Sequence, residues 1–157
     1  MIATIGLLST LDFIGEDTDN LVSIDKNTVR IRYNKTVQRI YIPIQISACH
    51  DSPKYLVNAV IDTGAIMSCV SQELARKMKL TPIDTTVLVT ANSQSEAPSY
   101  MVDVFFDTMC IKNVKVCSAE FKGRENTFLI GMDILNKGKL VIDNINGATT
   151  IEFTLKD

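Results

Sequence analysis

The clearest pattern in the chain is an alternation of apolar and polar positions between Val37 and Ile46. Positions 40, 42, 44 and 46 are all isoleucine, and they fall on one face of an extended segment because side chains alternate between the faces of a strand. The polar stretch from His50 to Lys54 then indicates a turn, and Tyr55 to Ile61 has the pattern of a second strand. These segments predict a hairpin whose second strand ends directly before Asp62, which lies in a tight turn.

The rest of the chain carries several shorter patterns of the same kind. Residues 28–33 also alternate, and further strands are predicted at residues 85–91, 100–106, 110–119, 127–130, 140–143 and 149–155. The polar tract Asn92 to Ser99 is typical of an exposed hairpin tip, and Asn146-Gly147 indicates a closing turn. Many short strands joined by turns favour an all-β barrel or a folded sheet.

Helical signals are few. Ser71 can cap a short helix that runs through Lys79, with Pro82 just beyond its end. Asp133 can cap a short helical turn that Gly138 ends.

Length and composition fit one β-rich domain. Isoleucine, valine and threonine supply 46 of the 157 residues, against 21 for alanine and leucine, and this balance favours strands. A chain of this length buries about two-thirds of the surface that it exposes when unfolded, so it needs no metal or disulfide to hold a core. Residues 1–35 are less regular and are predicted to be an N-terminal extension, either an extra strand or a pro-segment. Residues 36–157 form the main domain.

Charge and cysteine content exclude several classes of function. The formal net charge is −2 with both signs interspersed, so neither nucleic acid nor a membrane surface is expected as a partner, and no apolar run is long enough to span a bilayer. The four cysteines have irregular spacing and a single histidine to join them, so we expect no metal and no cofactor. We expect reduced cysteines and a cytoplasmic protein, with export as the less favoured alternative.

The segment Asp62-Thr63-Gly64-Ala65 places a carboxylate between two apolar runs. A buried carboxylate without a cationic partner is costly, so it must accept several hydrogen bonds or be protonated part of the time. Asp-x-Gly also occurs as an ordinary turn. These four residues alone leave both interpretations open.

A second segment, Leu129 to Leu135, sets Gly131 and Asp133 among apolar residues. Together with Val60 to Ala65 it resembles the retropepsin-like aspartic proteases, and more their cellular and bacterial branch than the viral one. In that family an apolar strand leads into Asp-Thr-Gly-Ala, a flap hairpin follows, and a Gly-x-Asp segment introduces the C-terminal helix. The resemblance covers about residues 37–153. It implies a closed β-barrel with a flap hairpin and one short C-terminal helix.

The resemblance also implies roles for the matching residues. Asp62 is expected to be the catalytic aspartate, supported by Thr63, Gly64 and Ala65, while Gly131 and Asp133 form a structural motif. Asp133 is expected to cap the helix rather than to act in catalysis. The flap residues that would contact substrate are Ala91, Asn92, Ser93, Gln94 and Ser95, and the flap tip, 92–97, lacks the glycines that are usual in the family.

A further difference from the viral members concerns two positions after the motifs. Viral members carry an acidic residue after Asp-Thr-Gly-Ala and an arginine after the second glycine, and the two pair. This chain has Ile66 and Met132 there, so an apolar contact is expected in place of the ion pair.

The number of motifs sets the expected assembly. Aspartic proteolysis needs two adjacent carboxylates, and the chain has a single Asp-Thr-Gly. A homodimer in which two Asp62 side chains meet at a twofold axis is therefore expected, with a peptide or protein as substrate. Two alternatives remain: a noncatalytic module of the same fold that binds peptides or assembles complexes, and an unrelated β-barrel in which Asp-Thr-Gly is only a turn.

Overall fold

The computed structural model describes residues 21–25, 27–49, 51–106, 109–121 and 127–156, and the first 20 residues of the predicted N-terminal extension lie outside this part. The described residues form eleven strands and two short helices. The strands are β1 (Leu21–Asp25), β2 (Thr28–Arg32), β3 (Tyr41–Ser47), β4 (Tyr55–Ile61), β5 (Cys69–Ser71), β6 (Asp84–Val89), β7 (Gln94–Phe106), β8 (Met109–Ala119), β9 (Thr127–Ile130), β10 (Gly138–Asp143) and β11 (Thr150–Leu155). The helices are α1 (Gln72–Lys77) and α2 (Met132–Leu135).

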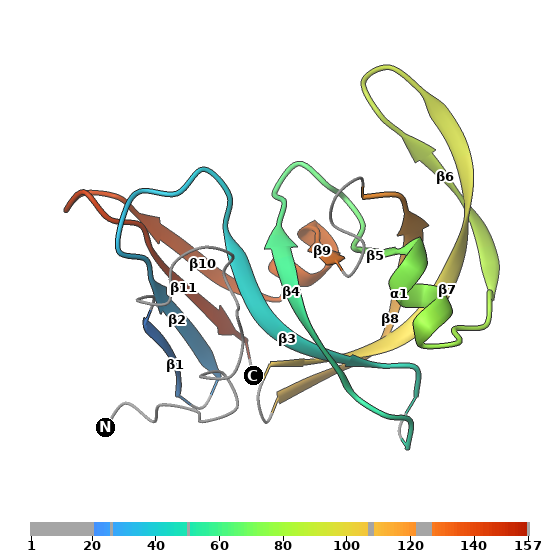
Figure 1. The fold of residues 1–157 in the computed structure, drawn as a ribbon, viewed down its shortest axis with the longest axis horizontal. Helices are drawn as coiled ribbons and strands as arrows, with labels where there is room; N and C mark the ends of the chain where they lie inside the picture. Colours follow the sequence, from blue (N-terminus) through green and yellow to red (C-terminus); the bar gives the residue numbers. More distant parts are fainter. Residues whose placement is uncertain (1–20, 26, 50, 107–108, 122–126, 157) are drawn as a thin grey trace.

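Six strands close into a barrel in the order β3-β4-β9-β5-β8-β7, because β7 pairs back onto β3. The pairs β4–β9 and β5–β8 are parallel, and the other neighbours are antiparallel. β6 pairs with the first half of β7 to form a hairpin that stands out from the barrel (Figure 1). The predicted closed barrel, projecting hairpin and short C-terminal helix are confirmed.

A second sheet, with the order β1-β2-β11-β10, lies beside the barrel (Figure 1). The Tyr33 hydroxyl joins the two parts, since it accepts from the backbone N–H of Tyr41 at 3.0 Å and donates to the Tyr41 carbonyl at 3.2 Å. The rings of Phe106 and Phe153 also meet between them, with centroids 5.5 Å apart. β10 is an edge strand of this sheet, and one of its residues, Ile142, lines the same cavity as Asp62.

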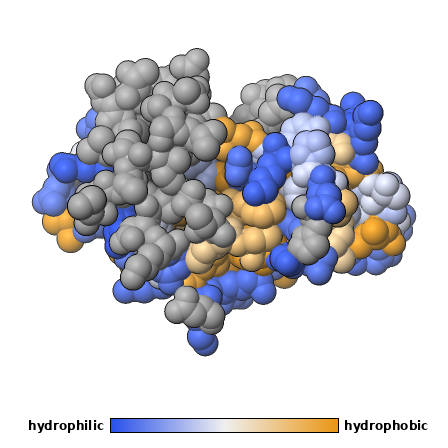
Figure 2. Space-filling view, turned by 90° about the horizontal axis from the view of Figure 1, so that it is seen from below, coloured by the Kyte–Doolittle hydropathy of each residue, from blue (hydrophilic) through white to orange (hydrophobic). Residues whose placement is uncertain are grey.

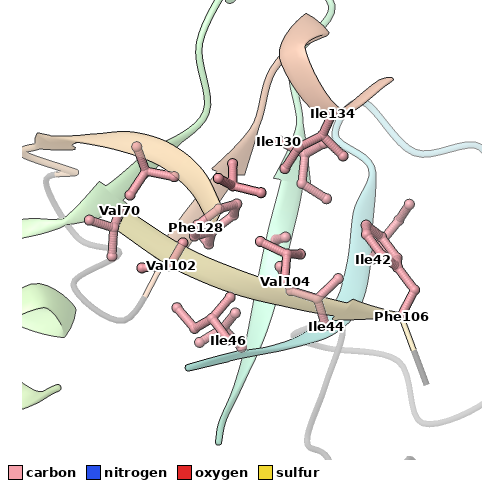
Figure 3. Packing of buried hydrophobic residues seen from close by; sticks show 14 of the residues in the cluster. Ile42, Ile44, Ile46, Val70, Val102, Val104, Phe106, Phe128, Ile130 and Ile134 are labelled. Atoms are coloured by element: carbon pink, nitrogen blue, oxygen red, sulfur yellow. The ribbon is translucent and has the colours of Figure 1, made fainter. Parts of the chain in front are cut away.

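The core lies inside the barrel and is built from alternate residues of its strands. Ile42, Ile44 and Ile46 of β3 are fully buried, as the isoleucine alternation predicts. Figure 3 shows them facing side chains of β7, β9 and α2, among which Val104, Phe128 and Ile134 are labelled. Burial of each such side chain stabilises the fold by roughly 1.5–3 kcal/mol. The outer surface is mixed: seen from below, a hydrophobic area is flanked by hydrophilic side chains (Figure 2).

Some predicted bounds differ from the structure for local reasons. β3 begins at Tyr41 and not at Val37, because the backbone before it bonds elsewhere: the Val37 N–H donates to the Thr149 hydroxyl at 3.0 Å. α1 is capped by Ser71 as predicted, but it ends at Lys77, and Lys79 has a positive φ of 54° that stops the helix. Neither helix of the described residues has the length and apolarity of a transmembrane span.

Candidate active site

Asp62 follows β4 directly, at the place where β4 and its parallel neighbour β9 both end. Ile61 of β4 is the register partner of Ile130 of β9, and the Asp62 N–H donates to the Ile130 carbonyl at 3.0 Å. The two sequence motifs, 69 residues apart, therefore start side by side at one edge of the barrel. Parallel pairing of their strands is the reason, because it brings both carboxyl ends to the same edge.

The Asp62 turn orients its own carboxylate. The Gly64 N–H donates to Asp62 Oδ1 at 2.9 Å, and the Ala65 N–H donates to the Asp62 carbonyl at 3.3 Å. A Cβ at Gly64 would lie 3.2 Å from Asp62 Oδ1, so glycine leaves the carboxylate room. Asp62 is partly exposed, and Thr63 and Gly64 are exposed. The carboxylate is thus held by the backbone and remains open to solvent.

The segment that contains Gly131 crosses over the Asp62 turn, and the two backbones are in direct contact. The Met132 N–H donates to the Ala65 carbonyl at 2.8 Å, and the Asp133 N–H donates to the Ile66 carbonyl at 3.2 Å. A Cβ at Gly131 would lie 2.8 Å from the carbonyl carbon of Met67, a distance that real Cβ atoms do not tolerate. Gly131 is therefore required by the close approach of two backbones.

Asp133 lies inside α2 and not at its N-cap position as predicted, but its carboxylate does accept a hydrogen bond in the first turn of that helix, from the Ile134 N–H at 2.9 Å. α2 begins at Met132, so Gly131 occupies the N-cap position and provides no side chain. The Asp133 carboxylate also accepts from the Ser68 N–H at 3.0 Å and from the Ser68 hydroxyl at 2.6 Å, and Ser68 Oγ accepts from the Gly131 N–H at 3.0 Å. These bonds tie the segment after the Asp62 turn to the start of α2. The Asp133 carboxylate is thus engaged in structural hydrogen bonds.

Sequence analysis missed Ser68, which is fully buried. Its signal was a hydroxyl within the apolar run 66–70, where a polar side chain requires partners.

Ser68→Ala is expected to destabilise the fold by about 2–4 kcal/mol, because it leaves the Asp133 carboxylate and the Gly131 N–H each short of a partner in a largely buried place. Urea unfolding followed by circular dichroism measures this. Ser93→Ala in the exposed turn is the matched control and should change the unfolding free energy by less than about 1 kcal/mol. Equal effects of the two substitutions would contradict the role given to Ser68.

The hairpin tip is shorter than predicted. Val89 pairs with Gln94, so the turn consists of the four residues 90–93, and the predicted tip residues Gln94, Ser95, Glu96 and Ala97 belong to β7. The Thr90 N–H donates to the Ser93 carbonyl at 2.8 Å, and the Ser93 N–H donates to the Thr90 hydroxyl at 3.1 Å. Side-chain oxygens close this turn in the absence of glycine. Ala91 and Asn92 occupy its exposed apex.

A cavity of about 330 Å³ lies next to Asp62 and Thr63. Ile40 and Arg39 line it from the segment before β3, and Ile142 lines it from the edge strand β10. Sequence analysis did not place β10 near Asp62. Within the described residues, the Gly64 N–H makes the one hydrogen bond to the Asp62 side chain, so no second carboxylate partners it.

Ile66 and Met132, which are expected to make an apolar contact, lie where the two motifs cross. The two positions are adjacent through the backbone, since the Met132 and Asp133 N–H groups bond to Ala65 and Ile66. The Ile66 side chain, however, is 87% exposed. It points away from the protein at a position beside the candidate active site.

The chain is similar to known proteins in sequence and in fold. The sequence profile of the family described as "gag-polyprotein putative aspartyl protease" matches residues 54–137, more than half of the chain. A retropepsin-like aspartic protease from Rickettsia conorii is 20% identical, with 84% of this chain and 98% of that one covered and a TM-score of 0.53. The protease of EIAV, solved with the inhibitor HBY-793, is 20% identical over 63% of this chain and 86% of that one, with a TM-score of 0.48. No curated protein matches the chain significantly.

The likeness to the Rickettsia protein is a likeness of fold, whereas the profile match spans both motifs. Residues 54–137 begin before β4 and end after α2, so they include the Asp62 turn and the Gly131 crossing.

Proposed function

Because the chain belongs to the gag-polyprotein aspartyl protease family, we propose that it is a homodimeric aspartic endopeptidase in which Asp62 of each subunit supplies one of two catalytic carboxylates. The observation that carries the proposal is the Asp62 carboxylate itself, held by the Gly64 N–H and open to a cavity of about 330 Å³. A carboxylate that served only to close a turn would not need such an opening.

The chemistry follows from the state of two adjacent carboxyl groups. Two such groups do not both ionise readily, so they share one proton. The ionised group takes a proton from water, whose oxygen then bonds to the carbonyl carbon of the peptide, while the other group gives its proton to the carbonyl oxygen. The C–N bond then breaks as the group that took the proton from water gives it to the peptide nitrogen, while a hydroxyl of the intermediate returns a proton to the other group, and the amine and the acid are released. Asp62 performs both roles, one in each subunit, and no metal or cofactor takes part in the proposed reaction.

Support for a dimer comes from exposed aliphatic side chains near Asp62. Ile66 follows the catalytic turn, and Ile142 is 45% exposed on β10 and lines the same cavity as Asp62. Large aliphatic side chains gain roughly 1.5–3 kcal/mol each on burial, and a second copy placed with its Asp62 opposite this one would cover them.

The β6–β7 hairpin is proposed to be the flap that closes over a bound peptide and excludes water. The alternating side chains of Val87 and Val89 are exposed on this hairpin and offer apolar contacts to a substrate. Ala91, Asn92 and Ser93 at its turn, and Gln94 and Ser95 at the start of β7, are the proposed flap residues of the site. Thr63 and Ala65 are proposed to support the catalytic pair on either side of Gly64.

Ile142→Lys is expected to weaken dimerisation by roughly 30-fold or more, because a charge replaces an apolar side chain twice in the symmetric interface. Sedimentation velocity over a range of protein concentrations gives the dissociation constant. Peptidase activity should fall with the dimer fraction.

Ile83→Lys is the matched control for this change, because Ile83 is 52% exposed and does not line the cavity beside Asp62. It should leave the dissociation constant unchanged. Dimers of normal affinity in Ile142→Lys would show that the interface lies elsewhere.

The activity is tested by incubating the purified protein with a library of proteome-derived peptides and identifying new termini by mass spectrometry. Cleavage that a statine peptide blocks supports the proposal. A folded dimer that binds the statine peptide but cleaves nothing would instead identify a noncatalytic peptide-binding module.

A further inference from the structure

Two cysteines face each other across adjacent strands in the wall of the barrel. Cys69 of β5 and Cys117 of β8 are register partners in a parallel pair, and their sulfur atoms are 2.8 Å apart. Cys69 is 9% exposed and Cys117 is fully buried. Their neighbours Val70 and Val116 point into the core, so the two thiols lie together on the other side of the strands.

The backbone geometry suits a covalent bond between them. Adjacent strands run about 4.8 Å apart, within the separation of about 4.4–6.8 Å between Cα atoms that disulfides span. The sulfur atoms already approach from paired positions, so only a small shift separates two thiols from one disulfide. Most buried cysteines are inert single side chains, and this pairing distinguishes these two from them.

The two thiols differ in acidity. The hydrogen bond from Cys69 lowers the pKa of Cys117, whereas the same hydrogen bond, followed by burial, raises the pKa of Cys69. The charges of Asp133 and Asp62 raise the pKa of Cys69 further. These shifts favour Cys117 as the thiolate of the pair, with Cys69 as the hydrogen-bond donor to it.

We propose that Cys69 and Cys117 form a reversible disulfide when the protein meets hydrogen peroxide. The Cys117 thiolate attacks one peroxide oxygen, the O–O bond breaks, and after protonation Cys117 carries a sulfenic acid and one water leaves. The Cys69 sulfur then attacks the sulfenic sulfur and loses its proton, and a second water leaves. In total two thiols and one peroxide give one disulfide and two waters, and a dithiol such as dithiothreitol reverses the change by thiol–disulfide exchange.

The bond would fix the part of the barrel next to the candidate site. Cys69 follows Ser68, which holds Asp133 and Gly131, and β8 is the neighbour of β7, the long strand of the hairpin. The disulfide would therefore lock the segment after the Asp62 turn to the strand that supports the hairpin. This inference does not depend on peptidase activity.

The test exposes the reduced full-length protein to hydrogen peroxide, blocks remaining thiols under denaturing conditions, and maps the cysteine peptides by mass spectrometry. We expect a loss of about 2 Da, protection of two of the four thiols, and one linked peptide pair that contains Cys69 and Cys117. The melting temperature of the oxidised protein should rise by about 5–10 °C and return with dithiothreitol.

Matched variants separate this pair from the other two cysteines. Cys49→Ser with Cys110→Ser should retain both the mass loss and the rise in melting temperature, and Cys117→Ala should lose both. The disulfide is mapped on the wild-type protein, so the test remains valid even if Cys117→Ala does not fold. Four blocked thiols after peroxide, a linkage through Cys49 or Cys110, or irreversible sulfinic acid at Cys69 or Cys117 would each overturn the proposal.

Discussion

Asp62→Asn is expected to abolish peptide hydrolysis, with a loss of at least about 10³-fold in kcat/KM, while the fold and the dimer remain. Asparagine has the same shape, and its side-chain oxygen can still accept from the Gly64 N–H. It cannot ionise or share a proton, however, so it can neither take a proton from water nor give one to the carbonyl oxygen. Hydrolysis of a peptide found in the library screen measures the loss, and sedimentation confirms the dimer.

The matched control for this substitution is Asp84→Asn. Asp84 is exposed on β6 and pairs with Lys115 at 2.7 Å. A surface ion pair of this kind contributes little to stability, so activity should stay close to that of the wild type. Asp62→Asn with full activity would remove Asp62 from the mechanism. Loss of activity together with loss of the folded dimer would assign Asp62 a structural role instead.

The second large effect is expected at Gly131. Gly131→Ala forces a Cβ to within 2.8 Å of Met67 C and 2.9 Å of the Ala65 and Met67 carbonyl oxygens, and these are backbone atoms that cannot rotate away. The two motifs would have to separate, and the bonds from Met132 and Asp133 across the turn would be lost. We expect a destabilisation of about 4 kcal/mol or more, measured by urea unfolding, or failure to fold.

Gly147→Ala separates this steric effect from backbone strain. Gly147 has φ of +74° in the turn between β10 and β11, but a Cβ there would meet nothing within 4 Å. Its cost should be only about 1–2 kcal/mol, from the left-handed conformation. Gly131 has an ordinary extended conformation, so equal costs at the two sites would contradict the crossing of the motifs.

Local patterns predicted much of the fold. The predicted bounds of β4 and β9 agree with the structure to the residue, and the isoleucines of β3 lie in the core as expected. Ser71 caps α1 because capping is a property of a few neighbouring residues. The Asp62 turn was recognised for the same reason, since its residues are consecutive.

Contacts between distant segments could not be predicted in the same way. β5 has only three residues and gains its partners from β8 and β9, far along the chain. The bond from Ser68 to Asp133 and the approach of Ile142 to the Asp62 cavity likewise depend on the closed barrel and the second sheet. The hairpin turn was misplaced because Thr90 and Ser93 close it with hydroxyl groups in place of glycine.

In the proposed enzyme, one active site is shared by two chains. Isothermal titration of the protein with a statine peptide, which mimics the tetrahedral intermediate, tests it by stoichiometry. The prediction is one inhibitor bound per two chains of wild type, and no binding to Asp62→Asn at the same concentrations. One inhibitor per chain, or binding that is unchanged in Asp62→Asn, would contradict the claim.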